Sequence, residues 1–203
     1  GVYDQAYQLM KYPIQLTSFA LGSAIQPVLS DHKNDLKYIE NEHNKLTQKL
    51  IALSVIIALG IHYNSKLIVD ILLGNNWGLV IPIIEIFNYS IPIQMISATC
   101  GGFFQSISRA DLLFQAGVRG ALIFISCIGF SIIIFKDVNS VAFAVSISFY
   151  LNYISIYYLL FRKGFKGSIR RFLKVQLFIL FKVLPYILIT ICIYELPVGL
   201  NYP

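Results

Sequence analysis

Six long apolar stretches alternate with shorter polar segments along the 203-residue chain. A bilayer core requires about 20 mainly apolar residues per helix, and each stretch is about that long or somewhat longer. The predicted spans are residues 3–29, 46–66, 79–106, 112–135, 140–161 and 175–194. The pattern therefore predicts an all-α fold, a polytopic membrane bundle of about six transmembrane helices that forms a single domain over residues 1–203.

The segment between the first two spans, residues 30–45, carries charges of both signs and almost no apolar run. It is typical of a solvated loop, with room for a short surface helix. His32 and His43 lie in it, and we expect both to be solvated. A metal site needs three or four converging ligands, and these histidines have no partners at such spacing.

A line of polar residues runs along the first predicted span. Its members recur every three or four positions, which places them on one face of a helix. They are Asp4, Gln8, Lys11, Gln15, Ser18, Gly22 and Gln26. The third span repeats this feature less regularly with Glu85 and Asn88, and Pro82 and Pro92 are expected to kink it. Such a face suits a neighbouring helix or a water-filled path better than lipid.

Composition supports a membrane protein, since 57% of the residues are hydrophobic, 13% are charged, and the mean hydropathy is +0.69. A net charge of +6 would suggest nucleic acid as a partner in a soluble protein. Here eleven Lys and Arg fall on the side of the first, third and fifth connections, and two on the other. Positive loops stay in the cytoplasm, so we expect that side to be cytoplasmic and expect no nucleic-acid partner.

Charged side chains inside a bilayer are costly and often mark substrate paths. The candidates here are Asp4, Lys11, Glu85, Arg119 and Lys182, accompanied by Gln8, Gln15 and Asn88. Arg119 and Lys182 lie close enough to helix ends to extend to the interface. We hypothesise that Lys11 and Arg119 face one central cavity suited to an anionic substrate.

No arrangement of residues predicts catalysis. The chain has no phosphate-binding glycine loop, no HExxH helix and no Asp-rich metal motif. Cys100, Cys127 and Cys192 lie in apolar runs and predict neither a disulfide nor a metal framework. Gly101-Gly102 is interpreted as a point of close helix packing. We therefore expect neither an enzyme nor a cofactor or bound metal.

Three segments resemble one family of membrane transporters. The first is GVYDQAYQLMKYPIQL with its continuation to Pro27 and Ser30, the second LLGNNWGLVIPIIEIF (72–87), and the third SRADLLFQAGVRGAL (108–122). In order and spacing they are similar to conserved stretches of the Wzx-type oligosaccharide and polysaccharide flippases. These belong to the multidrug/oligosaccharidyl-lipid/polysaccharide (MOP) superfamily, which also contains the MATE-like transporters.

The resemblance implies alternating access between two helical lobes in the bacterial cytoplasmic membrane. The substrate would be an undecaprenyl-diphosphate-linked oligosaccharide for surface lipopolysaccharide or exopolysaccharide. This chain would be most of the C-terminal lobe, with an N-terminal lobe of the same protein, membrane lipids, and polymerase and chain-length proteins as partners. Glu85 stands where the family commonly has an amide and Gln5 where it has a base, which leaves the coupling ion open.

Three alternatives remain. A MATE-like drug/cation antiporter would require carboxylates rather than bases to dominate the cavity. A multispan polysaccharide polymerase or lipid-sugar transferase would require a large outer loop with catalytic groups, whereas the outer loops here are short. A purely structural membrane subunit would not explain the polar line on residues 3–29.

Overall fold

The computed structural model describes residues 1–30, 32, 33, 35–167 and 169–195. Within the first and last helices it describes the side chains of residues 1–17, 29, 170, 173–186 and 188. The described chain consists of helices and contains no strand. They are α1 (Val2–Ser30), α2 (Leu36–Tyr63), α3 (Ser65–Leu72), the 3₁₀ helix η1 (Asn75–Val80), α4 (Ile81–Asn88), α5 (Ile91–Ser106), α6 (Ala110–Ile134), α7 (Val138–Tyr158), the π-helical turn η2 (Leu159–Gly164) and α8 (Ile169–Glu195). The prediction of an all-α fold is confirmed.

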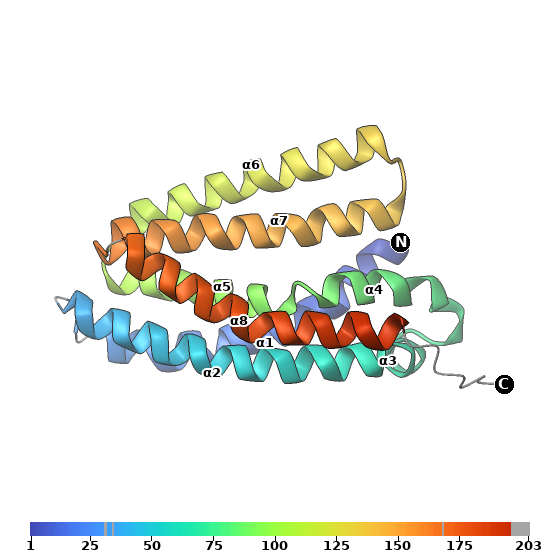
Figure 1. Ribbon diagram of the computed structural model, residues 1–203, viewed down its shortest axis with the longest axis horizontal. Helices are drawn as coiled ribbons and strands as arrows, with labels where there is room; N and C mark the ends of the chain where they lie inside the picture. The colour runs from blue at the N-terminus through green and yellow to red at the C-terminus, as the bar shows by residue number, and fades with distance from the viewer. Residues whose placement is uncertain (31, 34, 168, 196–203) are drawn as a thin grey trace.

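Helix α5 lies at the centre of the bundle and packs against α1, α2, α6 and α7. Its apolar side chains Met95, Ile96, Phe103 and Phe104 are fully buried. The longer helices run along the long axis of the molecule, with α8 beside α2 and α6 beside α7 (Figure 1). The hydrophobic core therefore forms around α5, and the surrounding helices each contribute one face to it.

Among the described residues, three helical segments are long and apolar enough to cross a membrane: Leu36–Tyr63, Ala110–Ile134 and Val138–Gly164. The pair Asn75–Asn88 and Ile91–Ser106 passes the same test as one bent span. Helix α6 also leaves large apolar side chains exposed, among them Phe114 and Ile133, which suits contact with lipid. The chain is an all-α membrane bundle. Helices α1 and α8 coincide in position with the first and sixth predicted spans, and the total of six spans stays a prediction.

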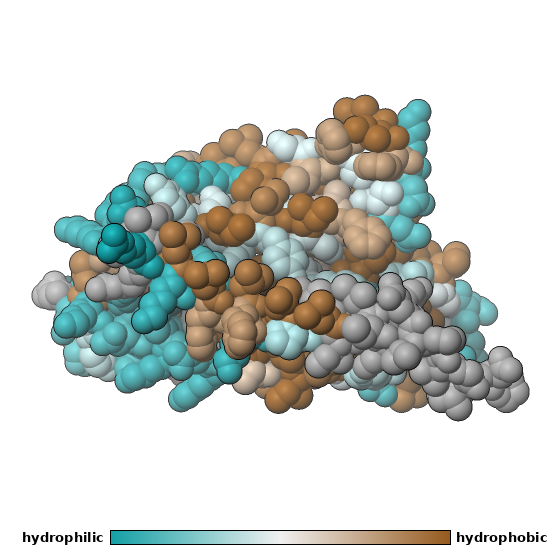
Figure 2. All heavy atoms as spheres, viewed as in Figure 1, coloured by the Kyte–Doolittle hydropathy of each residue, from teal (hydrophilic) through white to brown (hydrophobic). Residues whose placement is uncertain are grey.

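The connections between helices gather at two ends of the bundle. The α1–α2, α5–α6 and α7–α8 connections lie at one end, and the N-terminus and the α6–α7 connection lie at the other (Figure 1). Hydrophilic residues cover the first end, and an apolar band covers the middle (Figure 2). Arg109 Nη1 donates a hydrogen bond to the carbonyl oxygen of Lys163 at 3.2 Å, which joins two of these connections. Helices that cross a membrane in alternating directions place every second connection on the same side, and here the basic connections lie together in this way.

The prediction of a solvated loop over residues 30–45 is wrong for most of its length. Helix α2 begins at Leu36, ten residues before the predicted span, and Asp35 caps it by accepting a hydrogen bond from the Tyr38 backbone N–H at 2.9 Å. His43, expected in solvent, is 0% exposed. Burial of one face of this charged segment against α5, α7 and α8 explains why it is helical.

The third predicted span is divided into separate helices. α4 and α5 meet at an angle of 62° near Tyr89 and Ser90, and the 3₁₀ helix η1 precedes α4. Pro82 and Pro92 occupy the first or second position of α4 and α5 rather than kinking a helix interior. Proline is well tolerated there, because the N–H that it lacks has no partner in the first turn.

The close helix packing predicted at Gly101-Gly102 occurs instead between α6 and α7. A Cβ added at Gly101 would meet only Leu113 Cδ1 at 4.0 Å, an ordinary contact. A Cβ added at Gly120 would lie 2.8 Å from Asn152 Oδ1, so the Asn152 side chain would have to shift to make room for it. A small residue therefore sets the approach of α6 to α7.

Candidate functional site

Aromatic and sulfur contacts fix the rotation of α1 against the bundle. The rings of Tyr3 and Tyr7 meet Phe87 of α4 edge to face, with centroids 5.5 and 5.9 Å apart. Gln94 Nε2 of α5 donates a hydrogen bond to Met10 Sδ at 3.2 Å, and Ala6 is also buried. The predicted polar line is thereby turned away from the core.

The described members of the polar line lie on the outer face of α1. Asp4, Gln8 and Gln15 are exposed, and Lys11 is half-buried with its Nζ 5.3 Å from the centroid of the Tyr7 ring. The side chains of Ser18, Gly22 and Gln26 lie outside the described residues. No helix of the described chain covers Asp4, Gln8 or Gln15, so this polar face is available to water or to another protein segment.

A largely apolar cavity of about 530 Å³ adjoins this polar face. It lies between α1, the end of α2, α3, α4 and the start of α5. Its wall consists of Gln5, Gln8, Leu9, Met10, Tyr12, Leu16, Ile61, Ile68, Leu72, Leu73, Ile84 and Ile91. Gln5 and Gln8 are the only polar amides in this wall. An apolar hollow with a polar edge accommodates an amphiphile, with its apolar part in the hollow and its polar part against the edge.

Lys11, Arg119 and Lys182 do not come together. Arg119 is exposed on α6, and Lys182 is exposed on α8 with its Nζ 5.9 Å from the Phe178 ring centroid. Among four cavities lined by described residues, none is lined by both Lys11 and Arg119. A cavity shared by Lys11 and Arg119 stays a prediction.

Glu85 and Asn88 occupy different environments on α4. Glu85 is half-buried, accepts a hydrogen bond from Ser65 Oγ at 3.1 Å, and lines a cavity of about 290 Å³ with His62, Pro82, Ile86, Tyr89, Asn139 and Phe143. Asn88 is 1% exposed, and its Nδ2 donates to the Ala58 carbonyl and to Tyr186 Oη, each at 2.9 Å. Glu85 is therefore accessible from a cavity, whereas Asn88 joins α2, α4 and α8.

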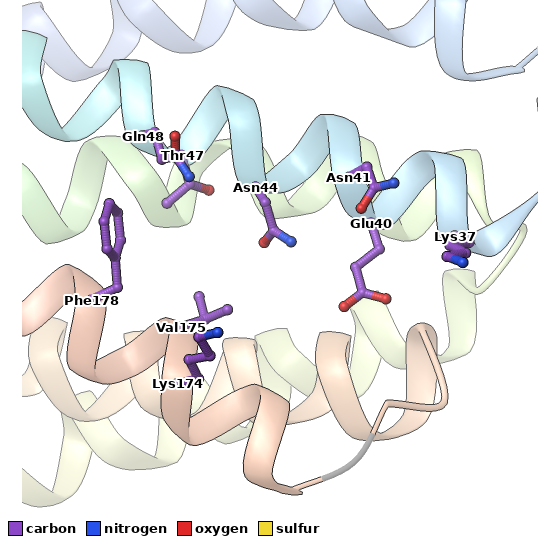
Figure 3. A pocket seen from close by; sticks show the side chains of 9 residues that line it. All are labelled: Lys37, Glu40, Asn41, Asn44, Thr47, Gln48, Lys174, Val175 and Phe178. Carbon is purple, nitrogen blue, oxygen red and sulfur yellow. The ribbon is translucent and has the colours of Figure 1, made fainter.

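A second polar line on the first half of α2 was missed by sequence reasoning. Its members recur at helical spacing and line a cavity of about 390 Å³ between α2 and α8. They are Lys37, Glu40, Asn41, Asn44, Thr47 and Gln48 (Figure 3). The same three-to-four-residue period that identified the line on α1 is present here. The mixed charges of residues 30–45 are typical of a loop and conceal this helical period.

Buried aromatic and polar groups lie behind this second polar line. The His43 ring packs against Phe103, Tyr157, Phe161 and Phe165, with centroid distances of 4.7, 5.3, 5.6 and 5.9 Å. Thr47 Oγ1 and Tyr157 Oη are 3.3 Å apart and share a hydrogen bond. The described residues contain no group of three His, Cys, Asp or Glu side chains that could hold a metal ion.

Comparison with known proteins finds one family model that matches part of the chain. Residues 1–82 match the family described as polysaccharide biosynthesis protein, which covers 82 of the 203 residues. The match includes α1 with its polar face, α2 and the start of α4. Neither the curated proteins nor the solved structures give a match to this chain. The family match supports a role in polysaccharide synthesis for this membrane bundle.

Proposed function

We propose that this chain is a lobe of a transporter that moves lipid-linked oligosaccharides across the bacterial cytoplasmic membrane. The substrate is an undecaprenyl-diphosphate-linked repeat unit, and the lobe acts by alternating access with an N-terminal lobe of the same protein. The proposed role is transport rather than catalysis, and the lobe is the C-terminal one.

The exposed polar face of α1 is the observation that carries the proposal. Asp4, Gln8 and Gln15 lie on the outside of a helix whose opposite face is packed into the core. Charged and amide side chains facing hydrocarbon would be costly, by about 2.5–3.5 kcal/mol for an aspartate at the bilayer centre on insertion scales. A hydrated path between two lobes removes this cost, so the polar face is best explained as one wall of that path.

The surroundings of the polar face fit an amphiphilic substrate. The apolar cavity of about 530 Å³ shares Gln8 with it, so polar and apolar surfaces meet along the same helix. The family match to polysaccharide biosynthesis protein covers this helix and supports a saccharide-carrying substrate. Lys11 offers a positive charge beside the same face, which suits a diphosphate.

A MATE-like drug/cation antiporter is the second candidate function. Glu85, half-buried in a cavity with His62, is the kind of carboxylate that such a transporter needs. On α1, however, Asp4 is accompanied by Lys11 and by neutral amides, so carboxylates do not dominate the polar face. The saccharide transporter is therefore the better-supported function.

Deletion of the gene that encodes this chain tests the proposal in its host. We expect lipid-linked repeat units to accumulate facing the cytoplasm and surface polysaccharide to be lost, with both defects reversed by the wild-type gene. Normal surface polysaccharide together with altered drug efflux would contradict the proposal and favour the antiporter.

A further inference from the structure

The outer surface of α6 carries two parallel rows of side chains near the end of the bundle where the basic connections gather. Among the described helices, α6 packs chiefly against α7 and less against α5 and η2, and it lies at the edge of the bundle (Figure 1). A spacing of four residues aligns each row along the helix. The polar row and the apolar row are, respectively, Asp111, Gln115 and Arg119, and Phe114, Val118 and Leu122.

Arg119 is an exposed cation without a partner in the described part of the chain. Its guanidinium has no hydrogen bond, ion pair or aromatic contact with a described residue. It lies nine residues after Ala110, the first residue of α6, which is about 13 Å along the helix at 1.5 Å per residue. Side chains leave a helix tilted toward its N-terminus, so that of Arg119 is directed back toward the start of α6. An arginine at this depth in a bilayer calls for a counter-charge, because a bare charge in hydrocarbon is costly.

Lys163, at the end of η2, adds a second positive charge to the polar row. Its Nζ donates a hydrogen bond to Gln115 Oε1 at 3.4 Å. Its carbonyl oxygen accepts a hydrogen bond from Arg109 Nη1 at 3.2 Å, which fixes the backbone of η2 beside the start of α6. The next residue, Gly164, lies so close to Ile107 that an added Cβ would be 3.0 Å from the Ile107 Cδ1 atom. The packing of η2 therefore holds the lysine against α6.

The carboxylate of the polar row is already paired. Asp111 accepts hydrogen bonds from Arg109 Nε and Nη2, each at 2.7 Å, and this two-fold contact offsets its charge. Within the described part of the chain, no carboxylate forms an ion pair with Lys163 or Arg119. The rest of the polar row is therefore positive and has donors to spare, so it selects an anion.

The apolar row distinguishes an anionic lipid from a free anion. Phe114, Val118 and Leu122 are 74%, 44% and 61% exposed, so a hydrocarbon chain can lie along them beside the polar row. Guanidinium and ammonium groups both bind phosphate oxygens. A zwitterionic phospholipid offers the same phosphate but adds a cation of its own, which Lys163 and Arg119 would repel. A phospholipid with a net negative charge matches both rows.

We propose that α6 and η2 form a binding site for an anionic phospholipid, whose phosphate lies between Arg119 and Lys163. The Gln115 amide N–H donates to the same phosphate while its oxygen holds the lysine, and one acyl chain lies along the apolar row. The site is on other helices than the polar face of α1, and it gives Arg119 a place on the outer surface of the lobe. It does not depend on the proposed transport function.

Native mass spectrometry of the complete protein, with lipids added in detergent, tests this site. The probes are phosphatidylglycerol, phosphatidylcholine with the same acyl chains, and inorganic phosphate as a competitor. We expect wild type to prefer phosphatidylglycerol, and Arg119→Gln and Lys163→Gln each to reduce this preference about fivefold. Arg170→Gln, which removes an exposed arginine from α8 at the same end, is the matched control and should leave the preference unchanged. Denaturant unfolding checks that each variant keeps its fold.

Several results would overturn the proposal. Equal binding of the two lipids by wild type would show that the site does not select charge. An equal loss in Arg170→Gln would indicate a general attraction to the basic end, and displacement of the lipid by inorganic phosphate would indicate a free-anion site. A lipid-free dimer would mean that a second copy covers α6. Reduced export by Arg119→Gln with an unchanged lipid preference would place Arg119 on the substrate path instead.

Export keeps this proposal separate from the transport function. Loss of the phosphatidylglycerol preference in Arg119→Gln and Lys163→Gln, but not in Arg170→Gln, supports the lipid site whatever deletion of the gene does to surface polysaccharide. Conversely, an unchanged preference in both folded variants would overturn the lipid site and leave the transport function intact.

Discussion

The first halves of α1 and α2 both carry a line of polar side chains at helical spacing, but the two lines meet different surroundings. On α1 the line faces outward, and no described helix covers Asp4, Gln8 or Gln15. On α2 the line faces α8, so that Glu40 and Thr47 are buried and a cavity forms between the helices. The difference arises from the packing partner, because among the described residues only the α2 line has a neighbouring helix along it.

The comparison separates two kinds of function for polar residues in a membrane bundle. A line covered by another helix of the same lobe can build an enclosed pocket with a fixed shape. A line left open needs water or a second lobe to avoid contact with lipid. We therefore expect changes on α2 to affect stability, and changes on α1 to affect transport with the fold intact.

The largest stability effect is expected at the base of the α2 line. His43→Ala removes a fully buried ring from contact with Phe103 and Tyr157, so the free energy of unfolding should fall by about 2–5 kcal/mol. His43→Phe should be neutral or stabilising, because both ring nitrogens of His43 are buried without hydrogen bonds among the described residues. Denaturant unfolding in mixed micelles measures both variants.

His32→Ala is the matched control, since His32 is exposed and stacks on Tyr38 at the surface, with ring centroids 4.2 Å apart. It should change the free energy of unfolding by less than about 1 kcal/mol. Equal effects of the two alanine substitutions would show that the start of α2 is solvated after all.

The next effect concerns Asn88, which joins three helices. Asn88→Ala removes the donor to the Ala58 carbonyl and to Tyr186 Oη, and we expect a loss of about 1–3 kcal/mol in the free energy of unfolding. Asn75→Ala, an exposed amide in η1, should have little effect. A stable Asn88→Ala protein that fails to transport would instead place Asn88 on the substrate path.

On α1 we expect the opposite behaviour. The double substitution Gln8→Leu and Gln15→Leu should reduce export of lipid-linked saccharide about tenfold, which corresponds to about 1.4 kcal/mol. Unfolding should be unaffected, because both side chains are exposed. Complementation of the deletion strain measures export, with Leu16→Ala on the apolar, 71% exposed side as the control. If Leu16→Ala reduces export as much, the polar face has no special role.

The smallest effect is expected for the hydrogen bond between Thr47 and Tyr157, whose oxygens are 3.3 Å apart. A double-mutant cycle with Thr47→Val and Tyr157→Phe should give a coupling of about 0.5–1.5 kcal/mol in unfolding free energy. Additive effects would mean that the cavity wall and the aromatic cluster behind it are energetically independent.

Sequence reasoning located the fold class and the helix pattern because apolar run length and the cost of exposed backbone in lipid constrain both. It also located the polar face of α1, because the helical period of 3.6 residues can be recognised from the order of neighbouring residues alone. It missed the burial of His43, which depends on α5, α7 and η2, segments more than fifty residues away. It predicted a kink in the third span, but it placed Pro82 and Pro92 within one helix and not at the starts of two helices.

Residues that sequence reasoning grouped by charge are separated in the fold. Lys11, Arg119 and Lys182 were grouped as cations in spans, but they lie on α1, α6 and α8, and none of the three lines any of the four cavities described above. The charge of a residue does not determine the direction in which its side chain points from the helix. The rotation of each helix is set by its apolar contacts, such as those of Tyr3 and Tyr7 with Phe87.

Water access to the polar face of α1 tests the central claim most directly. Single cysteines at Gln8 and Gln15, and at the exposed apolar positions Leu16 and Ile133, would be introduced with the native cysteines replaced by serine or alanine. A membrane-impermeant thiol reagent is then applied to the complete protein in intact vesicles. We predict fast labelling at positions 8 and 15 and slow labelling at positions 16 and 133. Equally slow labelling at all four positions would contradict the account, because the polar face would then be closed to water.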